Sequence, residues 1–111
     1  MLAYLASPFS DEDEAVQEQR FNDVCRAAGE LLNAGNFVYS PIAHSKPIAD
    51  QSQLPTDFAF WQAYDEEMIK RCDEVWVLKL EGWNRSVGIY NEVELAVKYG
   101  KPVRYLDPVY A

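Results

Sequence analysis

The chain has 111 residues, of which 49% are hydrophobic and 14% aromatic, and its formal net charge is -8. This length suits one domain with a hydrophobic core, so we expect residues 1–111 to form a single domain. The negative charge argues against a nucleic-acid polymer as partner, because neutralising phosphates requires a basic surface. A single mononucleotide is compatible with this charge, since a few local donors can hold it.

Targeting and metal-binding patterns are missing from the sequence. Residues 1–6 lack the basic start of a signal peptide, and no apolar run approaches the roughly 18 residues that cross a membrane. Cys25 and Cys72 fall in apolar stripes of predicted helices, so we expect two buried thiols and no disulfide. One histidine and two distant cysteines give no metal-ligand spacing. We therefore expect a cytoplasmic protein with no membrane contact, no metal and no cofactor.

The first third of the chain predicts a strand, a helix and a second strand. Residues 2–6 are apolar and predict a buried strand. Ser10 with Asp13 forms a capping-box pattern for a helix that ends at Gly35. Residues 37–39 predict the second strand.

The rest of the chain predicts a long loop, followed by helices and strands that alternate again. Residues 41–56, rich in Pro, Ser, Gln and Asp, predict a long loop, and loops of this length are usually functional or mobile. A helix over 61–72 and a strand over 74–80 follow. Residues 82–86 then predict a turn. It leads into a helix that ends at Gly100, before a last strand over 102–106.

This alternation predicts an α/β fold. We expect a three-layer sandwich of the flavodoxin or Rossmann type, with a four- to five-stranded, mainly parallel sheet flanked by helices. Ligands of such folds bind beyond the carboxyl ends of the strands, where the strand order switches. The predicted site is therefore bordered by residues 7–10, 41–46 and 82–88.

Two carboxylates fall where core residues are expected. Asp65 lies four residues after Trp61 and four before Ile69, inside an apolar helical stripe. Glu92 likewise lies between Ile89 and Ala96. A buried carboxylate is costly unless it is paired or used, so the two predict a working acid pair.

Each acid also has a structural interpretation. Asp65 could pair with Lys70 or Arg71 or cap a neighbouring backbone group, and Glu92 could lie at the edge of the core and reach solvent.

Several further side chains are candidates for binding. Ser86 and Gly88 stand at a helix start, where free N–H groups and the helix dipole favour an anion. Ser86 could equally serve only as the helix cap, and Tyr4 could simply pack in the first strand. His44 in the predicted loop is either a lid residue or polar surface.

The order and spacing of these motifs resemble the nucleoside 2-deoxyribosyltransferase superfamily over nearly the whole chain. The motifs are Tyr4-Leu5-Ala6-Ser7-Pro8-Phe9, Asp65 with Asp73 eight residues on, Ser86-x-Gly88-x-x-x-Glu92 and Gly100-Lys101-Pro102-Val103. The opening motif and the Ser-Pro-Ile-Ala-His-Ser segment over 40–45 are most similar to the branch called domain of unknown function 1937.

The resemblance implies roles for individual residues. Glu92 matches the nucleophile that attacks the anomeric carbon, Tyr4 matches the tyrosine that orients it, and Asp65 matches an acid that contacts the base or handles its proton. Transferases usually carry Asp at the position of Ser86, whereas the related deoxynucleoside 5′-monophosphate hydrolases carry Ser. Ser86 therefore favours a nucleotide, with Ser7 and Arg85 as additional donors.

The first loop departs from the family pattern. Ser7-Pro8-Phe9-Ser10 replaces the Gly-rich loop of the hydrolases and offers fewer backbone donors, although we expect Ser7, Pro8 and Phe9 to contact substrate. The resemblance also implies a homo-oligomer, a dimer or larger.

The expected activity is cleavage or transfer at the N-glycosidic bond of a nucleoside or nucleoside 5′-monophosphate. The alternative is a nucleotide-binding module of the same fold without turnover, and a plain flavodoxin-like interaction domain is a third interpretation.

Overall fold

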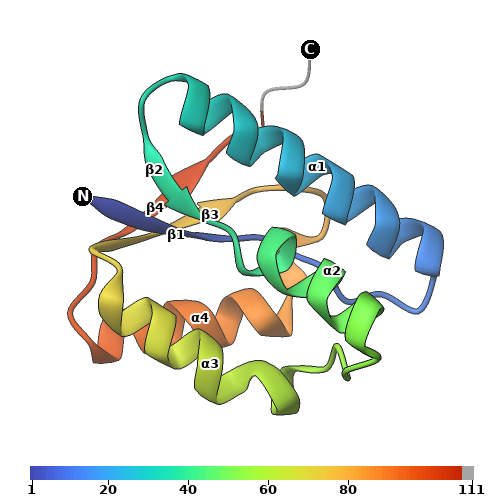
Figure 1. Cartoon of the computed structure of the whole chain (residues 1–111). Coiled ribbons are helices and arrows are strands. Elements are labelled where there is room, and N and C mark those ends of the chain that lie inside the picture. Colours follow the sequence, from blue (N-terminus) through green and yellow to red (C-terminus); the bar gives the residue numbers. More distant parts are fainter. Residues whose placement is uncertain (109–111) are drawn as a thin grey trace.

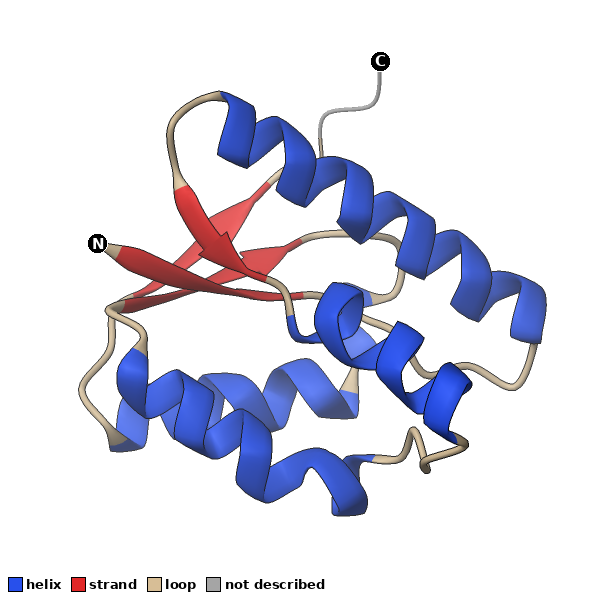
Figure 2. Cartoon of the chain, in the orientation of Figure 1, coloured by secondary structure: helices blue, strands red, loops and turns tan. Residues whose placement is uncertain are grey.

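A computed structural model describes residues 1–108, in which strands and helices alternate along the chain. The elements are β1 (Leu2–Ala6), α1 (Glu14–Asn33), β2 (Phe37–Tyr39), α2 (Pro41–Ser52), α3 (Phe58–Arg71), β3 (Glu74–Leu78), the 3-10 turn η1 (Trp83–Arg85), α4 (Val87–Lys98) and β4 (Val103–Leu106). The secondary structure is shown in Figure 2.

The four strands form one parallel sheet in the order β2-β1-β3-β4. Tyr4 of β1 lies in register with Tyr39 of β2 on one side and with Val75 of β3 on the other. The predicted α/β fold with a parallel sheet and flanking helices is therefore confirmed, with four strands among residues 1–108.

The two faces of the sheet carry different helices (Figure 1). Side chains alternate along β1, so Ala3 and Leu5 pack with Val24 of α1, whereas Tyr4 and Ala6 pack on the other face. That other face is covered by α3 and α4. Helix α2 lies beyond the carboxyl end of the sheet, beside the start of α1.

The prediction of a long loop over residues 41–56 is wrong, because most of this segment forms helix α2. The Ser40 hydroxyl accepts a hydrogen bond from Ala43 N at 3.1 Å, and Pro41 occupies the first helical position, which it favours. Pro47 lies inside the helix and costs it one hydrogen bond. The composition suggested a loop, whereas the Ser-Pro start carried the helix signal. Only residues 53–57 connect α2 to α3.

The capping box predicted at Ser10 and Asp13 is also wrong. Helix α1 begins at Glu14, and the Asp13 side chain caps it by accepting from Ala15 N at 2.9 Å. Asp11 accepts from Asp13 N at 2.9 Å and holds the preceding residues in a turn.

The two thiols differ in burial. Cys72 is buried as expected, whereas Cys25 is partly exposed because it lies beside, not within, the buried stripe of α1. Among the helices of residues 1–108, none combines the length and the apolar character needed to cross a membrane.

Candidate active site

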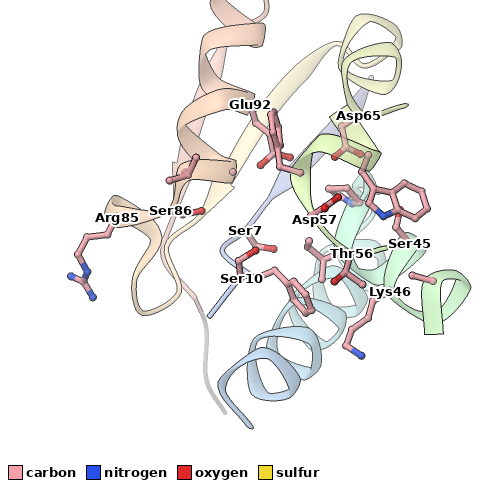
Figure 3. Close-up of a pocket in the computed structure, with 18 residues that line it drawn as sticks. Ser7, Ser10, Ser45, Lys46, Thr56, Asp57, Asp65, Arg85, Ser86 and Glu92 are labelled. Carbon is pink, nitrogen blue, oxygen red and sulfur yellow. The ribbon is translucent and has the colours of Figure 1, made fainter. Parts of the chain in front are cut away.

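A cavity of about 290 Å³ opens at the carboxyl end of the sheet, near the lower end of the range for small-molecule sites. The chain leaves β1 towards α1 on one face and leaves β3 towards α4 on the other, which makes this the switch point of the sheet. The loop after β1, the η1–α4 segment, α2 and the start of α3 all contribute to its wall (Figure 3). The cavity therefore lies where the sequence predicted the site.

Glu92 forms the deep end of this cavity. Its side chain points inward from the second turn of α4, and the residue is only 7% exposed. The fully buried Tyr4 of β1 donates a hydrogen bond from its hydroxyl to Oε2 of Glu92. This bond fixes one carboxylate oxygen and leaves Oε1 as the oxygen available to a reactant.

Burial shifts the protonation of this pair. Desolvation raises the pKa of Glu92 to about 8, with the negative charge of Asp65 adding to the rise and the Tyr4 hydrogen bond opposing it. Burial also raises the pKa of Tyr4 well above its usual value, and the adjacent Glu92 charge raises it further. Tyr4 therefore stays a hydrogen-bond donor at neutral pH.

Asp65 supplies the second carboxylate, on α3. Its Oδ1 is buried and has no hydrogen-bond partner among the described residues, and burial raises its pKa to about 6. The ion pair considered for it with Lys70 or Arg71 does not form. Both cations instead approach Glu67, at 4.0 Å and 2.8 Å. Asp65 is thus a partly buried acid with one buried oxygen that has no hydrogen-bond partner among residues 1–108, and it lines the same cavity as Glu92.

Hydroxyl groups line the opposite end of the cavity. The Ser86 hydroxyl caps α4 by accepting a hydrogen bond from Ile89 N at 3.2 Å. Ser86 also lines the cavity. Ser7 lies between Ser86 and Thr56 in Figure 3, and its buried hydroxyl has no partner among residues 1–108. Gly88 is in the first turn of α4, beside the free N–H groups of the helix start.

The remaining predicted site residues divide into two groups. Phe9 and Arg85 line the cavity, although the Arg85 guanidinium points away from it and approaches Glu81 at 3.4 Å. Pro8 is buried behind the wall, and His44 is exposed outside it. The structure therefore does not bring Pro8 or His44 to the cavity wall.

His44 belongs instead to a row of aromatic rings. Its imidazole stacks on Tyr64 with ring centroids 5.7 Å apart and an interplanar angle of 8°, and it tilts against Tyr39 at 5.6 Å. These contacts tie α2 to α3 and β2. The role of His44 in the structure is to hold the elements behind the wall together.

One wall of the cavity was predicted only in part. The predicted border over residues 41–46 includes Ser45 and Lys46, but neither was named as a site residue, and Ala49, Thr56, Asp57 and Trp61 lie in the wall without having been predicted there. Ser45, Lys46 and Ala49 lie on α2, which was predicted as loop, so their common helical face could not be recognised. Asp57 was recognisable as a helix cap, and it accepts from Phe60 N at 3.0 Å. Trp61 donates from its indole N–H to Pro55 O at 2.8 Å and so holds the short α2–α3 connection.

The cationic groups near this wall form ion pairs with acids and point away from the cavity. Lys46 Nζ lies 2.7 Å from Asp50 and 3.8 Å from Glu18, and its ammonium points away from the cavity in Figure 3. Within residues 1–108, no cluster of three or more His, Cys, Asp or Glu side chains is placed to hold a metal ion. The polar side chains that remain in the cavity wall are the hydroxyls and the carboxylates of Glu92, Asp65 and Asp57, of which Asp57 caps α3.

The fold is similar to that of a nucleoside-processing enzyme. The structure of a 2-deoxyribosyltransferase from Bacillus psychrosaccharolyticus, described as a biocatalyst for the synthesis of antiviral and antitumoral nucleosides, matches with a TM-score of 0.64 and 26% identity. The match covers 100% of this chain and 75% of that one. The chain thus has a nucleoside 2-deoxyribosyltransferase-like fold.

Its family is defined by a sequence model. Residues 2–107 match the family described as domain of unknown function (DUF1937), so the chain belongs to that family. A search of curated proteins gave no match. The family assignment agrees with the resemblance found in the sequence motifs.

Proposed function

We propose that this protein cleaves or transfers the N-glycosidic bond of a nucleoside or a nucleoside 5′-monophosphate. The observation that carries the proposal is the placement of Glu92, buried and held by Tyr4, in one cavity with the unpaired Asp65. A protein gains no stability from two buried acids that lack cationic partners, so their retention is best explained by use. The likeness to a deoxyribosyltransferase supports the same class of reaction.

In the proposed first step, Glu92 Oε1 forms a bond to the anomeric carbon of the sugar while the bond from that carbon to the base breaks. The electron pair of the broken bond leaves with the base, which takes a proton from the Asp65 carboxyl group. The transition state resembles an oxocarbenium ion, and the carboxylates stabilise its positive charge. The products are a free base and a glycosyl ester of Glu92.

The second step returns the enzyme to its starting state. Water or another base attacks the anomeric carbon, the ester bond to Glu92 breaks, and Asp65 accepts the proton that the attacking group loses. Attack by water completes hydrolysis, whereas attack by a base completes transfer. The aromatic side chains of Phe9, Phe58 and Trp61 also line the cavity, and such rings suit a planar base.

The hydroxyl end of the cavity favours a phosphate on the sugar. Ser7 has a free buried hydroxyl, Ser86 and Gly88 lie at the start of α4, and a carboxylate that would repel phosphate is missing at position 86. Arg85 stands at the rim, where a rotation of its exposed side chain would bring the guanidinium to an anion. A nucleoside 5′-monophosphate is therefore the preferred substrate of the proposal.

One observation favours the alternative, a nucleotide-binding module without turnover. With a pKa of about 8 set mainly by burial, Glu92 is largely protonated at neutral pH in the ligand-free protein, and a protonated carboxyl is a poor nucleophile. The enzyme proposal requires that bound substrate deprotonates Glu92 while Asp65 holds the proton for the leaving base.

The deciding experiment compares two acids of the same helix. The protein is incubated with a panel of nucleosides and 5′-monophosphates, and free base is followed by chromatography. We expect Glu92→Gln to lower base release by about a thousandfold or more, as for other catalytic nucleophiles. Glu94→Gln is the matched control, because Glu94 is exposed and lies outside this cavity. Saturable binding without base release from any compound would favour the binding module.

We also propose that the protein is a cytoplasmic homo-oligomer. Val87, Tyr90 and Val97 expose 71%, 65% and 72% of their surface along the outer side of α4, which suits a contact with another copy. Light scattering of the wild type and of Tyr90→Lys tests this. A monomeric wild type would contradict the proposal.

A further inference from the structure

Arg20 is a partly buried cation that belongs to neither the cavity wall nor the core. It lies in the second turn of α1, and its side chain is only 14% exposed. Its Nη1 donates to Ser10 O at 2.8 Å and to Phe9 O at 3.3 Å, and its Nη2 donates to Glu81 O at 3.2 Å. The nearest acid, Asp11, is 3.9 Å away, so backbone carbonyls and not an ion pair account for most of its contacts.

The two guanidinium nitrogens bind two different loops. Nη1 binds the loop after β1, and Nη2 binds the loop after β3. These loops follow neighbouring strands but have left the ladder of the sheet, so their carbonyl groups need other donors. A planar guanidinium can satisfy both at once, because its donors point in fixed directions.

The loop after β3 is shaped to receive this side chain. Gly82 has a φ of +89°, and a Cβ at this position would lie 2.6 Å from Nη2 of Arg20. Any residue other than glycine would therefore be strained and would displace the guanidinium. The close approach is a specific fit between α1 and the turn.

Both loops lead directly into the hydroxyl end of the cavity. Phe9 and Ser10, whose carbonyls Arg20 binds, line the cavity themselves. On the other side, Arg85 N donates to Gly82 O at 3.0 Å, which closes a tight turn before Ser86. A shift of Gly82 would therefore also move Ser86, which follows it by four residues.

We propose that Arg20 is a positioning residue, which sets the separation between Ser7–Ser10 and the Ser86–Gly88 helix start and thereby the fit of the sugar-phosphate end of the ligand. This inference takes the identity of the ligand from the proposed function and therefore rests on it. Arg20 itself touches no reacting atom and acts through the two loops.

The test uses Arg20→Gln and Arg20→Lys, with Arg26→Gln as the control because Arg26 is an exposed arginine of the same helix. Amide hydrogen exchange of the intact protein is measured first. We expect exchange in both residues 7–13 and residues 80–86 to rise by about tenfold in Arg20→Gln, the size of one lost charged hydrogen bond. Strands β1 and β3 should keep their protection.

Arg20→Lys separates geometry from charge. A lysine keeps the positive charge but has one compact donor group, so it should leave at least one of the two loops as loose as in Arg20→Gln. If Arg20→Lys restores the protection of both loops, or if β1 and β3 lose protection together with the loops, positioning by the guanidinium is wrong.

Steady-state kinetics then connect the loops to the ligand. For a substrate that the wild type cleaves, Arg20→Gln should raise KM by about tenfold with a much smaller change in kcat. An unchanged KM, or an equal effect of Arg26→Gln, would overturn the inference. If the wild type cleaves nothing, the proposed function fails, and hydrogen exchange alone still decides whether Arg20 positions the loops.

Discussion

Both faces of the sheet are covered by helices, but they differ in the kinds of side chain that they bury. On the α1 face, Leu5, Val24 and Leu78 form a core with apolar side chains only. On the α3–α4 face, the core residue Tyr4 is bonded to Glu92, and Asp65 has a buried oxygen without a partner. The α1 face is an apolar core, whereas the α3–α4 face carries acidic groups whose burial costs stability. This contrast can be tested by substitutions on each face.

The largest expected effect is on the α1 face. Leu5→Ala removes a fully buried side chain and should lower the free energy of unfolding by about 3 kcal/mol, while the activity of the folded fraction stays unchanged. Ile89→Ala, one turn before Glu92 on α4, is the matched truncation on the other face and should lower both. Chemical denaturation and activity assays of the two variants check this. Equal loss of activity in both would contradict the division between faces.

The next largest expected effect is the decrease in the free energy of unfolding that Glu92 causes at high pH. Its pKa rises from 4.5 to about 8 on folding, so between these pH values the folded state holds a proton that the unfolded state has lost. Stability should therefore fall as pH rises across this range. Glu92→Gln removes the dependence and should be more stable relative to wild type at pH 9 than at pH 4, by several kcal/mol. Thermal denaturation at the two pH values measures it, with Glu94→Gln as the control.

Tyr4→Phe should have a smaller effect that is confined to the acid pair. Loss of the hydroxyl removes the hydrogen bond that stabilises the charged form of Glu92, so the pKa of Glu92 should rise further. Base release at neutral pH should fall by about tenfold and recover in part at higher pH. Tyr39→Phe, on the neighbouring strand at the register position of Tyr4, is the control. An unchanged pH profile in Tyr4→Phe would count against the orienting role of Tyr4.

The smallest effect concerns the shape of the pH profile. With pKa values of about 6 for Asp65 and about 8 for Glu92, both set mainly by burial, the wild-type kcat/KM should change across pH 6 to 8. Asp65→Asn should abolish one of the two inflections and add about 1 kcal/mol of stability above pH 6. Profiles of kcat/KM between pH 5 and 9 check the first expectation. A variant that keeps both inflections would exclude Asp65 as a titrating group of the reaction.

Local patterns were sufficient where a single element carries the signal. Asp65 and Glu92 interrupt apolar stripes of their own helices, and this one-dimensional pattern already predicted that they turn towards the core. The Ser40-Pro41 start of α2 was also visible but was outweighed by the composition of residues 41–56. The helical face that Ala49 shares with Ser45 and Lys46 was therefore not recognised.

Long-range contacts have no such local signature. Arg20 looks like a surface residue of α1, yet it contacts Glu81, which is 61 positions away. His44 resembled a lid residue because it was assigned to a loop, whereas the packing of α2 against α3 stacks it on Tyr64. Neither role depends on neighbours in the sequence.

By itself, the sequence determined the order of the strands and of every helix except α2, the parallel α/β class and the edge where a site would form, because these follow from the period of apolar residues and from the chirality of βαβ connections. Only the tertiary structure decided that Tyr4 reaches Glu92 across 88 residues, that Asp65 has no cation beside it, and that Arg20 joins two loops of the site. Such contacts depend on how close two elements pack and on the direction of individual side chains, which periodicity does not encode.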